Sequence, residues 1–255
     1  MLNDYLWFSK DYIKVGYIGK DQTFVEETHN SLGEAFISLY EYFKPKEKFP
    51  SIRAVIVPDR NEFDRLVKEL LKVDIETPSR SSRIAQTQKT DIVILSPSAY
   101  KRDSIYEYRP DEYRRLLFHE ATHVMEEYIS PNIETQQRWW SEGLAVNLST
   151  QWRYEDEFRE PVLKGLKNKQ IPNFKEIQED ARLSYQWGWT IVKYIEELYT
   201  PIMIAKIVKA CENGDVFNIL GKDIKSLEKE WKKWLTNKEK GSYIEKNRNC
   251  WRSWS

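Results

Sequence analysis

Apolar and polar positions alternate in short blocks over the first hundred residues, and the pattern changes several times between strand-like and helical. Runs rich in β-branched and aromatic residues predict strands, and apolar residues that recur every three or four positions predict helices. We expect strands at 4–18 (one or two, broken near 9–11), 54–57, 83–88 and 92–95, and helices at 25–43 and 59–70. This order predicts a small mixed sheet with helices packed on it.

A longer helical pattern begins near residue 110. Pro110 stands near the first helical position and two acidic residues follow it, as the positive end of the helix dipole favours. Pro131 marks the end of this helix. The apolar stripe of the helix consists of Leu117, Ala121, Val124 and Tyr128. Such a stripe predicts a central, mostly buried helix. Ser141 is then a good N-cap for the helix that follows.

From residue 155 onward every segment has a helical pattern. Helix stops are expected at Pro161, Pro172, Pro201 and Gly214. A stripe on the last helix consists of Leu227, Trp231, Trp234 and Leu235. The chain is therefore expected to be an α+β protein, with a mixed α/β subdomain over 1–109, a helical subdomain over 110–240 and a tail over 241–255.

Composition limits the range of partners. Forty basic and forty acidic residues give zero formal net charge, so no global field attracts nucleic acid or an anionic membrane. No apolar run approaches the roughly 18 residues of a transmembrane helix. Residues 1–20 lack the basic region and apolar segment of a signal peptide. We therefore expect a soluble, cytoplasmic protein, although a secreted protein that has lost its signal peptide would have the same sequence.

Two features near the C-terminus leave alternatives open. Cys211 and Cys250 are too few for a disulfide framework and are expected to be thiols, unless an oxidising compartment joins them. Residues 222–255 carry ten Lys or Arg against five Asp or Glu, with Trp251 and Trp254 near the end. This composition fits a solvated helix face and a docking or disordered tail, and it also fits contact with a membrane surface or nucleic acid.

Two histidines and a glutamate stand together in the helix that begins near Pro110. His119 and His123 are four residues apart, which is about 40° around a helix, so both can bind one metal ion. Glu120 lies beside that ion without having to bind it, which suits a base that takes a proton from water. Catalytic zinc usually has three protein ligands, and Glu142 is the natural third. We expect one Zn²⁺ ion per chain.

Other interpretations of these residues stay open. A structural metal site, or a site that binds metal without catalysing a reaction, would use the same side chains. The third histidine of the chain, His29, falls within the predicted helix 25–43. It is expected to be a surface or core residue and not a metal ligand.

The segment 116–124, with its His-Glu-x-x-His sequence, and the segment 139–145, with Ser-Glu-Gly-Leu-Ala, resemble the gluzincin metallopeptidases. More narrowly, they resemble the peptidase MA-like group. Many clans share His-Glu-x-x-His, but its combination with Glu-Gly-Leu-Ala is far more selective. Weaker similarity, including 183–189 and 227–231, extends the resemblance over most of 50–236. The resemblance implies zinc-dependent hydrolysis of peptide bonds in a thermolysin-like cleft between the sheet and the helical subdomain.

The resemblance does not supply an obvious donor for the oxyanion that forms during peptide hydrolysis. Thermolysin-like enzymes use a downstream histidine, but no histidine follows His123. A tyrosine, an arginine or a main-chain group must then serve. By resemblance to gluzincins that use a tyrosine from a later helix, Tyr185 is the first candidate, although it also fits an ordinary core aromatic. Tyr154 and Tyr199 are weaker candidates.

Residues 84–87 are the candidate edge strand for binding substrate. They stand between the other strands and the metal helix and carry few bulky apolar side chains. An exposed edge can add an extended peptide as one more strand, although an ordinary hairpin arm would have the same sequence. The Gly-x-Met-Glu-Asn element of gluzincin aminopeptidases is absent from 83–118, which favours an endopeptidase.

A function of another class fits the same pattern. The alternative is a catalytically inactive gluzincin-fold protein that binds an extended polypeptide as a scaffold or regulator. Under both hypotheses the partner is a peptide or protein, no nucleic acid is expected, and the oligomeric state is not indicated by the sequence.

Overall fold

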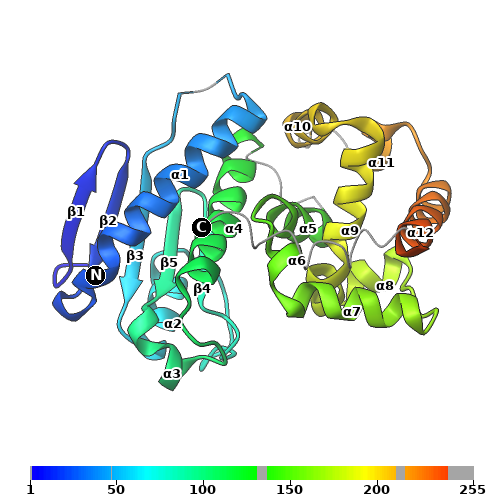
Figure 1. Ribbon diagram of the computed structural model, residues 1–255. Coiled ribbons are helices and arrows are strands. Elements are labelled where there is room, and N and C mark those ends of the chain that lie inside the picture. The colour runs from blue at the N-terminus through cyan, green and yellow to red at the C-terminus, as the bar shows by residue number, and fades with distance from the viewer. Residues whose placement is uncertain (1, 47, 131–136, 211–215, 241–255) are drawn as a thin grey trace, which may run out of the picture. The chain divides into compact units, whose positions relative to one another are not determined.

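The computed structural model of the chain describes residues 2–46, 48–130, 137–210 and 216–240. Within these residues a five-stranded sheet is combined with a majority of helices, which confirms the expected α+β composition (Figure 1). The strands are β1 (Leu6–Lys10), β2 (Ile13–Tyr17), β3 (Ile52–Val57), β4 (Ala85–Gln88) and β5 (Asp91–Leu95). The helices up to residue 129 are η1 (Gly19–Phe24), α1 (Val25–Phe43), α2 (Arg60–Glu69), η2 (Pro97–Ala99), α3 (Tyr100–Asp103) and α4 (Pro110–Ile129). The later helices are α5 (Arg138–Leu148), α6 (Gln151–Tyr154), α7 (Asp156–Lys167), α8 (Phe174–Glu179), α9 (Ala181–Tyr199), α10 (Pro201–Ala210), α11 (Val216–Leu220) and α12 (Ile224–Lys240).

The chain divides into two compact units, Met1–Ile129 and Ser130–Ser255. The change in hydrophobic pattern predicts a border at 109/110, before α4 begins. The observed division comes later because α4 packs against α1 and β4 and so belongs to the first unit. The predicted tail, 241–255, and both cysteines lie outside the described residues.

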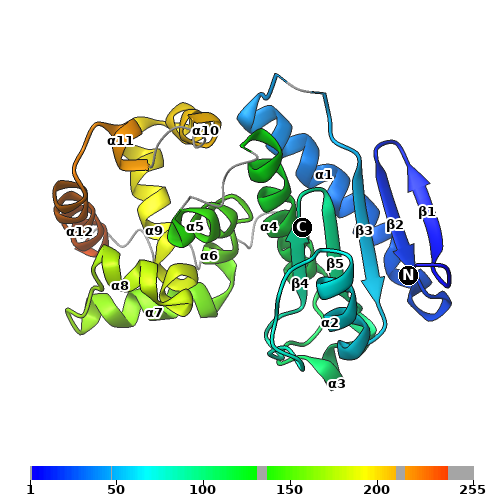
Figure 2. The same cartoon turned by 180° about the vertical axis from the view of Figure 1, so that it is seen from behind.

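The sheet of the first unit has the strand order β1-β2-β3-β5-β4. Strands β2, β3 and β5 run parallel, and β1 and β4 join the two edges in antiparallel orientation. Strands β3 and β5 are almost entirely buried, with α1 and α2 on opposite faces of the sheet (Figures 1 and 2). Strand β4 is half-buried along its length. Its position confirms the prediction that 84–87 forms an edge.

Local signals fix the helix ends in this unit. Helix α1 ends before Pro45, with Lys44 in the left-handed conformation at a φ of 47°. Asp59 caps α2, because its carboxylate accepts a hydrogen bond of 2.9 Å from the N–H of Glu62. The Arg60 guanidinium then donates to the hydroxyl of Ser79 and to the carbonyl of Arg83. These two bonds hold the connection that leads into β4.

The second unit is helical, with α5 and α9 as its most extensively packed pair. The backbones of the two helices are in close contact at Gly143 and Gly188. The predicted stripe on α12 is confirmed, since Leu227, Trp231 and Leu235 are buried. Trp234 is half-buried and donates a hydrogen bond to Glu197. Within the described ranges, no helix combines the length and apolar character that crossing a membrane requires.

The predicted start of α5 is wrong. The helix begins at Arg138, with Gln137 and not Ser141 as its N-cap. It starts earlier because Trp139 and Trp140 are both buried side chains of the helix itself. Glu142 therefore lies one turn further into the helix than expected.

The predicted helix stops have mixed outcomes. Pro161 does not end a helix, since α7 continues through it to Lys167. A proline inside a helix removes one backbone hydrogen bond, but the buried side chains of Phe158 and Val162 hold α7 against its neighbours. Pro172 precedes α8 and Pro201 begins α10, as predicted. Gly214 lies outside the described residues.

Candidate metal centre

The beginning of α4 and the segment just before it are bonded to α1. The Thr28 and Tyr113 hydroxyls lie 2.8 Å apart, and the Tyr108 hydroxyl donates to Glu27 at 2.6 Å. Burial raises the pKa of Tyr113, and burial together with Glu27 raises the pKa of Tyr108 to about 12, so both phenols keep their protons at neutral pH. Further along α4, its predicted apolar stripe is buried at Leu117, Ala121 and Val124, with Tyr128 half-buried. The prediction of a mostly buried helix is confirmed.

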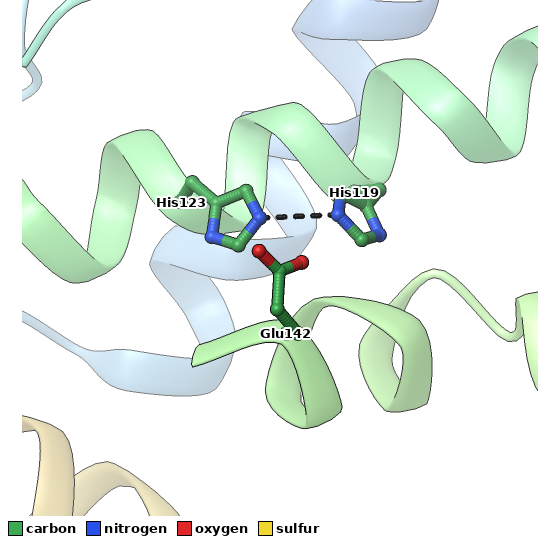
Figure 3. Close-up of side chains that lie close together, drawn as sticks. All are labelled: His119, His123 and Glu142. Carbon is green, nitrogen blue, oxygen red and sulfur yellow. Dashed lines mark hydrogen bonds between the residues drawn. The ribbon is translucent and has the colours of Figure 1, made fainter. Parts of the chain in front are cut away.

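His119 and His123 lie close together on α4. The Nε2 atoms of His119 and His123 lie 3.0 Å apart, and the rings meet nearly edge to face, with centroids 4.8 Å apart (Figure 3). Two nitrogen ligands at about 2.0–2.1 Å from a tetrahedral zinc ion are separated by about 3.3 Å. The observed separation is close to that value, so the pair fits one metal ion.

Glu142 completes a group of three potential ligands. One ligand atom each from His119, His123 and Glu142 lies within 4.8 Å of the other two, and Figure 3 shows the carboxylate directed toward the imidazole nitrogens. His119 is buried, and the other two side chains are half-buried. A two-imidazole, one-carboxylate set is a typical donor set for catalytic zinc. The three residues chosen from the sequence therefore come together as a group that could hold a metal ion.

Glu120 is also buried, at 7% exposed, but it is not one of the three grouped ligands. Its Oε2 atom accepts a hydrogen bond of 2.5 Å from the hydroxyl of Thr87 on β4. The carboxylate thus points from α4 toward the edge strand. This contact was not predicted, because the sequence places Thr87 on the edge but does not give the direction of its side chain.

A second glutamate on α4 holds the same hairpin. Glu127 accepts hydrogen bonds from the Gln88 side chain at 3.1 Å and from the backbone N–H of Lys89 at 2.5 Å. It follows Glu120 by seven residues, which is two turns and about 10.5 Å along the helix. The edge strand and its turn are therefore joined to α4 at two separate points.

The hydrogen-bond register of β4 identifies its outward groups. The N–H of Leu95 donates to the carbonyl of Ile84, and Ala85 is opposite Ile94. Hydrogen-bonded pairs alternate along an antiparallel ladder, so the backbone groups of Ala85 and Thr87 point away from β5, toward the open edge. The Gln86 side-chain amide lies 3.4 Å from the outward carbonyl of Thr87.

The candidate oxyanion residue lies on α9, in the same unit as Glu142. Tyr185 is 38% exposed and stands three residues before Gly188, whose backbone packs on Gly143 beside Glu142. Its role as a donor stays a prediction. Tyr199 lies about 21 Å further along α9, where the Lys222 ammonium is 5.8 Å from its ring. Tyr154 is the last residue of α6.

His29 has a core position, which is one of the two alternatives that the sequence leaves open. It is 6% exposed on α1, and its Nε2 atom lies 3.2 Å from the carbonyl oxygen of Lys10. Its ring meets that of Phe8 edge to face at 5.1 Å. These contacts account for the residue without a metal.

Neither a scan against protein-family models nor a search of curated proteins finds a match to this sequence. The resemblance to gluzincins therefore rests on the motif residues themselves.

Proposed function

We propose that the protein is a zinc-dependent peptidase of the gluzincin type. It binds extended peptides and cleaves them internally, as an endopeptidase. The observation that carries the proposal is the grouping of His119, His123 and Glu142. Glu120 follows His119 on α4 and lies outside this group, bonded to Thr87. A thermolysin-like gluzincin fold is part of the same proposal. It is supported by the mixed sheet before the metal helix and the helices after it.

The proposed roles follow from the chemistry of the side chains. His119, His123 and Glu142 hold the ion, which when bound supplies Lewis-acid polarisation of a carbonyl and makes water more acidic. The Glu120 carboxylate accepts a proton as the water oxygen adds to the scissile carbonyl carbon. It gives that proton to the nitrogen as the carbon–nitrogen bond breaks. The products are a carboxylic acid and an amine, and transfer of the remaining water proton between them gives a carboxylate and an ammonium group at neutral pH.

Strand β4 is the proposed binding edge for the substrate backbone. The outward N–H and carbonyl groups of Ala85 and Thr87 can pair with an extended peptide, as in other cases of strand addition. A pairing peptide would replace the Gln86 amide at the Thr87 carbonyl. Tyr185 is proposed as the donor to the oxyanion, supported by its partial exposure on α9 near the helix crossing beside Glu142.

The open edge of β4 also favours a second candidate function. A protein that keeps the metal and the edge strand but lacks turnover would bind an extended polypeptide as a scaffold or regulator. Both functions use the same backbone groups, so they differ in turnover and not in binding.

Metal removal and restoration distinguish these possibilities. We expect about one zinc ion per chain, in line with a single three-ligand site, and cleavage of members of a broad peptide library. Chelation of the zinc should abolish cleavage by wild type, and added zinc should restore it. After the same treatment, Glu142→Ala should neither bind the added zinc nor cleave peptides. Stoichiometric zinc without cleavage of any peptide would favour the scaffold, and protein with no measurable zinc affinity would contradict both.

A further inference from the structure

Thr87 contacts two different parts of the proposed site. Its side-chain hydroxyl donates to Glu120 Oε2, while its backbone groups face the open edge of β4. Most hydrogen bonds of the strand either join β4 to β5 or reach Glu127 two turns away on α4. Thr87 is thus the residue of β4 that joins the peptide-pairing edge to the carboxylate of Glu120.

We infer that Thr87 is a positioning residue, which fixes the Glu120 carboxylate and links peptide pairing on β4 to the base. This inference rests on the proposed peptidase function. A glutamate side chain has several rotatable bonds, and a base must be held within hydrogen-bond reach of the proton that it accepts. The β-branched side chain of Thr87 has restricted rotation and belongs to a strand paired with β5, so it provides a fixed donor.

The geometry of the bond suits this role. A carboxylate has two oxygens that accept hydrogen bonds, and Thr87 donates to Oε2. Oε1 can then accept the proton from water. The backbone of Thr87 would align a peptide paired with β4, and the side chain of the same residue would orient the Glu120 carboxylate.

The anchor at Glu127 allows the role to be tested without releasing the strand. Gln88 and Lys89 are bonded to Glu127 independently of the Thr87 hydroxyl, so these bonds should remain when that hydroxyl is removed. Thr87→Val keeps the size and β-branching of the side chain and removes only the donor. Thr87→Ser keeps the donor. Thr28→Val is a matched control, because it also removes a buried threonine hydroxyl in the first unit. That hydroxyl contacts Tyr113 and not Glu120.

The test measures kcat and KM for the zinc-loaded variants, with crystal structures of wild type and Thr87→Val. For Thr87→Val we expect kcat to fall about tenfold to a hundredfold, the size expected when a reacting group is misplaced by about 1 Å. The KM should stay within about twofold because backbone pairing is retained. Thr87→Ser should recover most of kcat, and Thr28→Val should lower thermal stability without the loss in kcat. In the Thr87→Val crystal the Glu120 carboxylate should leave its wild-type orientation.

Several results would overturn the inference. An unchanged kcat in Thr87→Val, a change confined to KM, or a Thr87→Ser variant as impaired as Thr87→Val would each do so. If wild-type protein cleaves no peptide, the proposed function fails by itself, and the crystal structures still decide the role of Thr87. A Glu120 carboxylate with the same orientation in wild type and Thr87→Val would show that Thr87 does not position it.

Discussion

The backbones of Gly143 and Gly188 touch where α5 crosses α9. A Cβ atom added to Gly143 would lie 2.4 Å from the carbonyl carbon of Gly188, and one added to Gly188 would lie 2.4 Å from the carbonyl oxygen of Trp139. Neither position can hold a side chain unless the helices separate. Since Glu142 directly precedes Gly143, the crossing also fixes the backbone that carries the third proposed ligand.

Gly143→Ala is therefore expected to lower the free energy of unfolding by about 3 kcal/mol, the upper end of the cost of overpacking. The obstructing atoms belong to the backbone, so a rotamer change cannot relieve the clash. Gly33→Ala is the control, since an added Cβ there has Ile13 Cδ1 at 3.9 Å and the position is inside α1. That variant should gain about 0.5–1 kcal/mol from better helix propensity. Chemical denaturation measures both values, and a Gly143→Ala protein as stable as wild type would contradict the crossing.

Proline substitutions test which backbone groups of β4 face outward. Ala85→Pro removes an N–H that points to the open edge, so the fold should keep its melting temperature while the KM for peptides rises severalfold. Gln86→Pro removes an N–H that pairs with β5 and should destabilise the protein by about 3 kcal/mol, the usual scale for a misplaced proline. Thermal unfolding and peptide kinetics separate the two effects. Equal loss of stability in both variants would show that the inferred register is wrong.

Glu62 provides a prediction for the pH dependence of stability. Its carboxylate accepts hydrogen bonds from Arg65 and from the Tyr5 hydroxyl, and the Arg65 bond is the main cause that holds its pKa below the ordinary value of 4.5. A carboxylate with a lowered pKa in the folded state stabilises the fold above its unfolded pKa, and this contribution disappears as the pH falls through the folded pKa.

Glu62→Gln should therefore cost about 1 kcal/mol of unfolding free energy at pH 7, a typical value for such a bond. The difference from wild type should shrink as the pH is lowered below 4.5. Glu69→Gln is the control, since Glu69 bonds to the same Arg65 but its side chain is 47% exposed, so its loss should matter little. Denaturant titrations across pH 3–7 test this, and a difference that stays constant over that range would refute the assignment.

Zinc should stabilise the folded protein through the grouped ligands. At a free zinc concentration of about 100 times the Kd, binding to the folded state alone adds about 2.7 kcal/mol. We expect the melting temperature of wild type to rise on addition of zinc and that of His123→Ala to stay unchanged. His29→Ala removes the histidine outside the group and should keep the zinc-induced rise, whatever its starting stability. If His29→Ala lost the zinc-induced rise in melting temperature and His123→Ala kept it, the metal would bind outside the proposed group.

Much of the fold follows from local patterns in the sequence. The buried run at 54–57, the polar strand at 84–87 and the stripe on the last helix were predictable because each has the periodicity of one element with one buried side. The ligand group was predictable because His119 and His123 share a helix face. Catalytic zinc usually has three protein ligands, which indicated Glu142 as the third. Local signals failed where packing decides, since the burial of Trp139 and Trp140 set the start of α5.

Contacts between distant side chains could not be predicted in the same way. The bond from Thr87 to Glu120 spans 33 positions of sequence and depends on how β4 lies against α4. The hydrophobic periodicity of the sequence does not indicate how a strand is oriented against a helix. The same is true of Glu127 and Lys89, whose bond requires the position of the hairpin turn on the helix.

The most direct test of the central claim compares zinc content and peptide turnover in wild type and Glu120→Gln. Glutamine has the shape of glutamate but cannot accept the proton, and Glu120 is not in the ligand group. Glu120→Gln is therefore expected to keep about one zinc ion per chain and to lose turnover by a factor of at least about 10², the lower range for general-base catalysis. A variant that retains both its zinc and wild-type turnover would contradict the account.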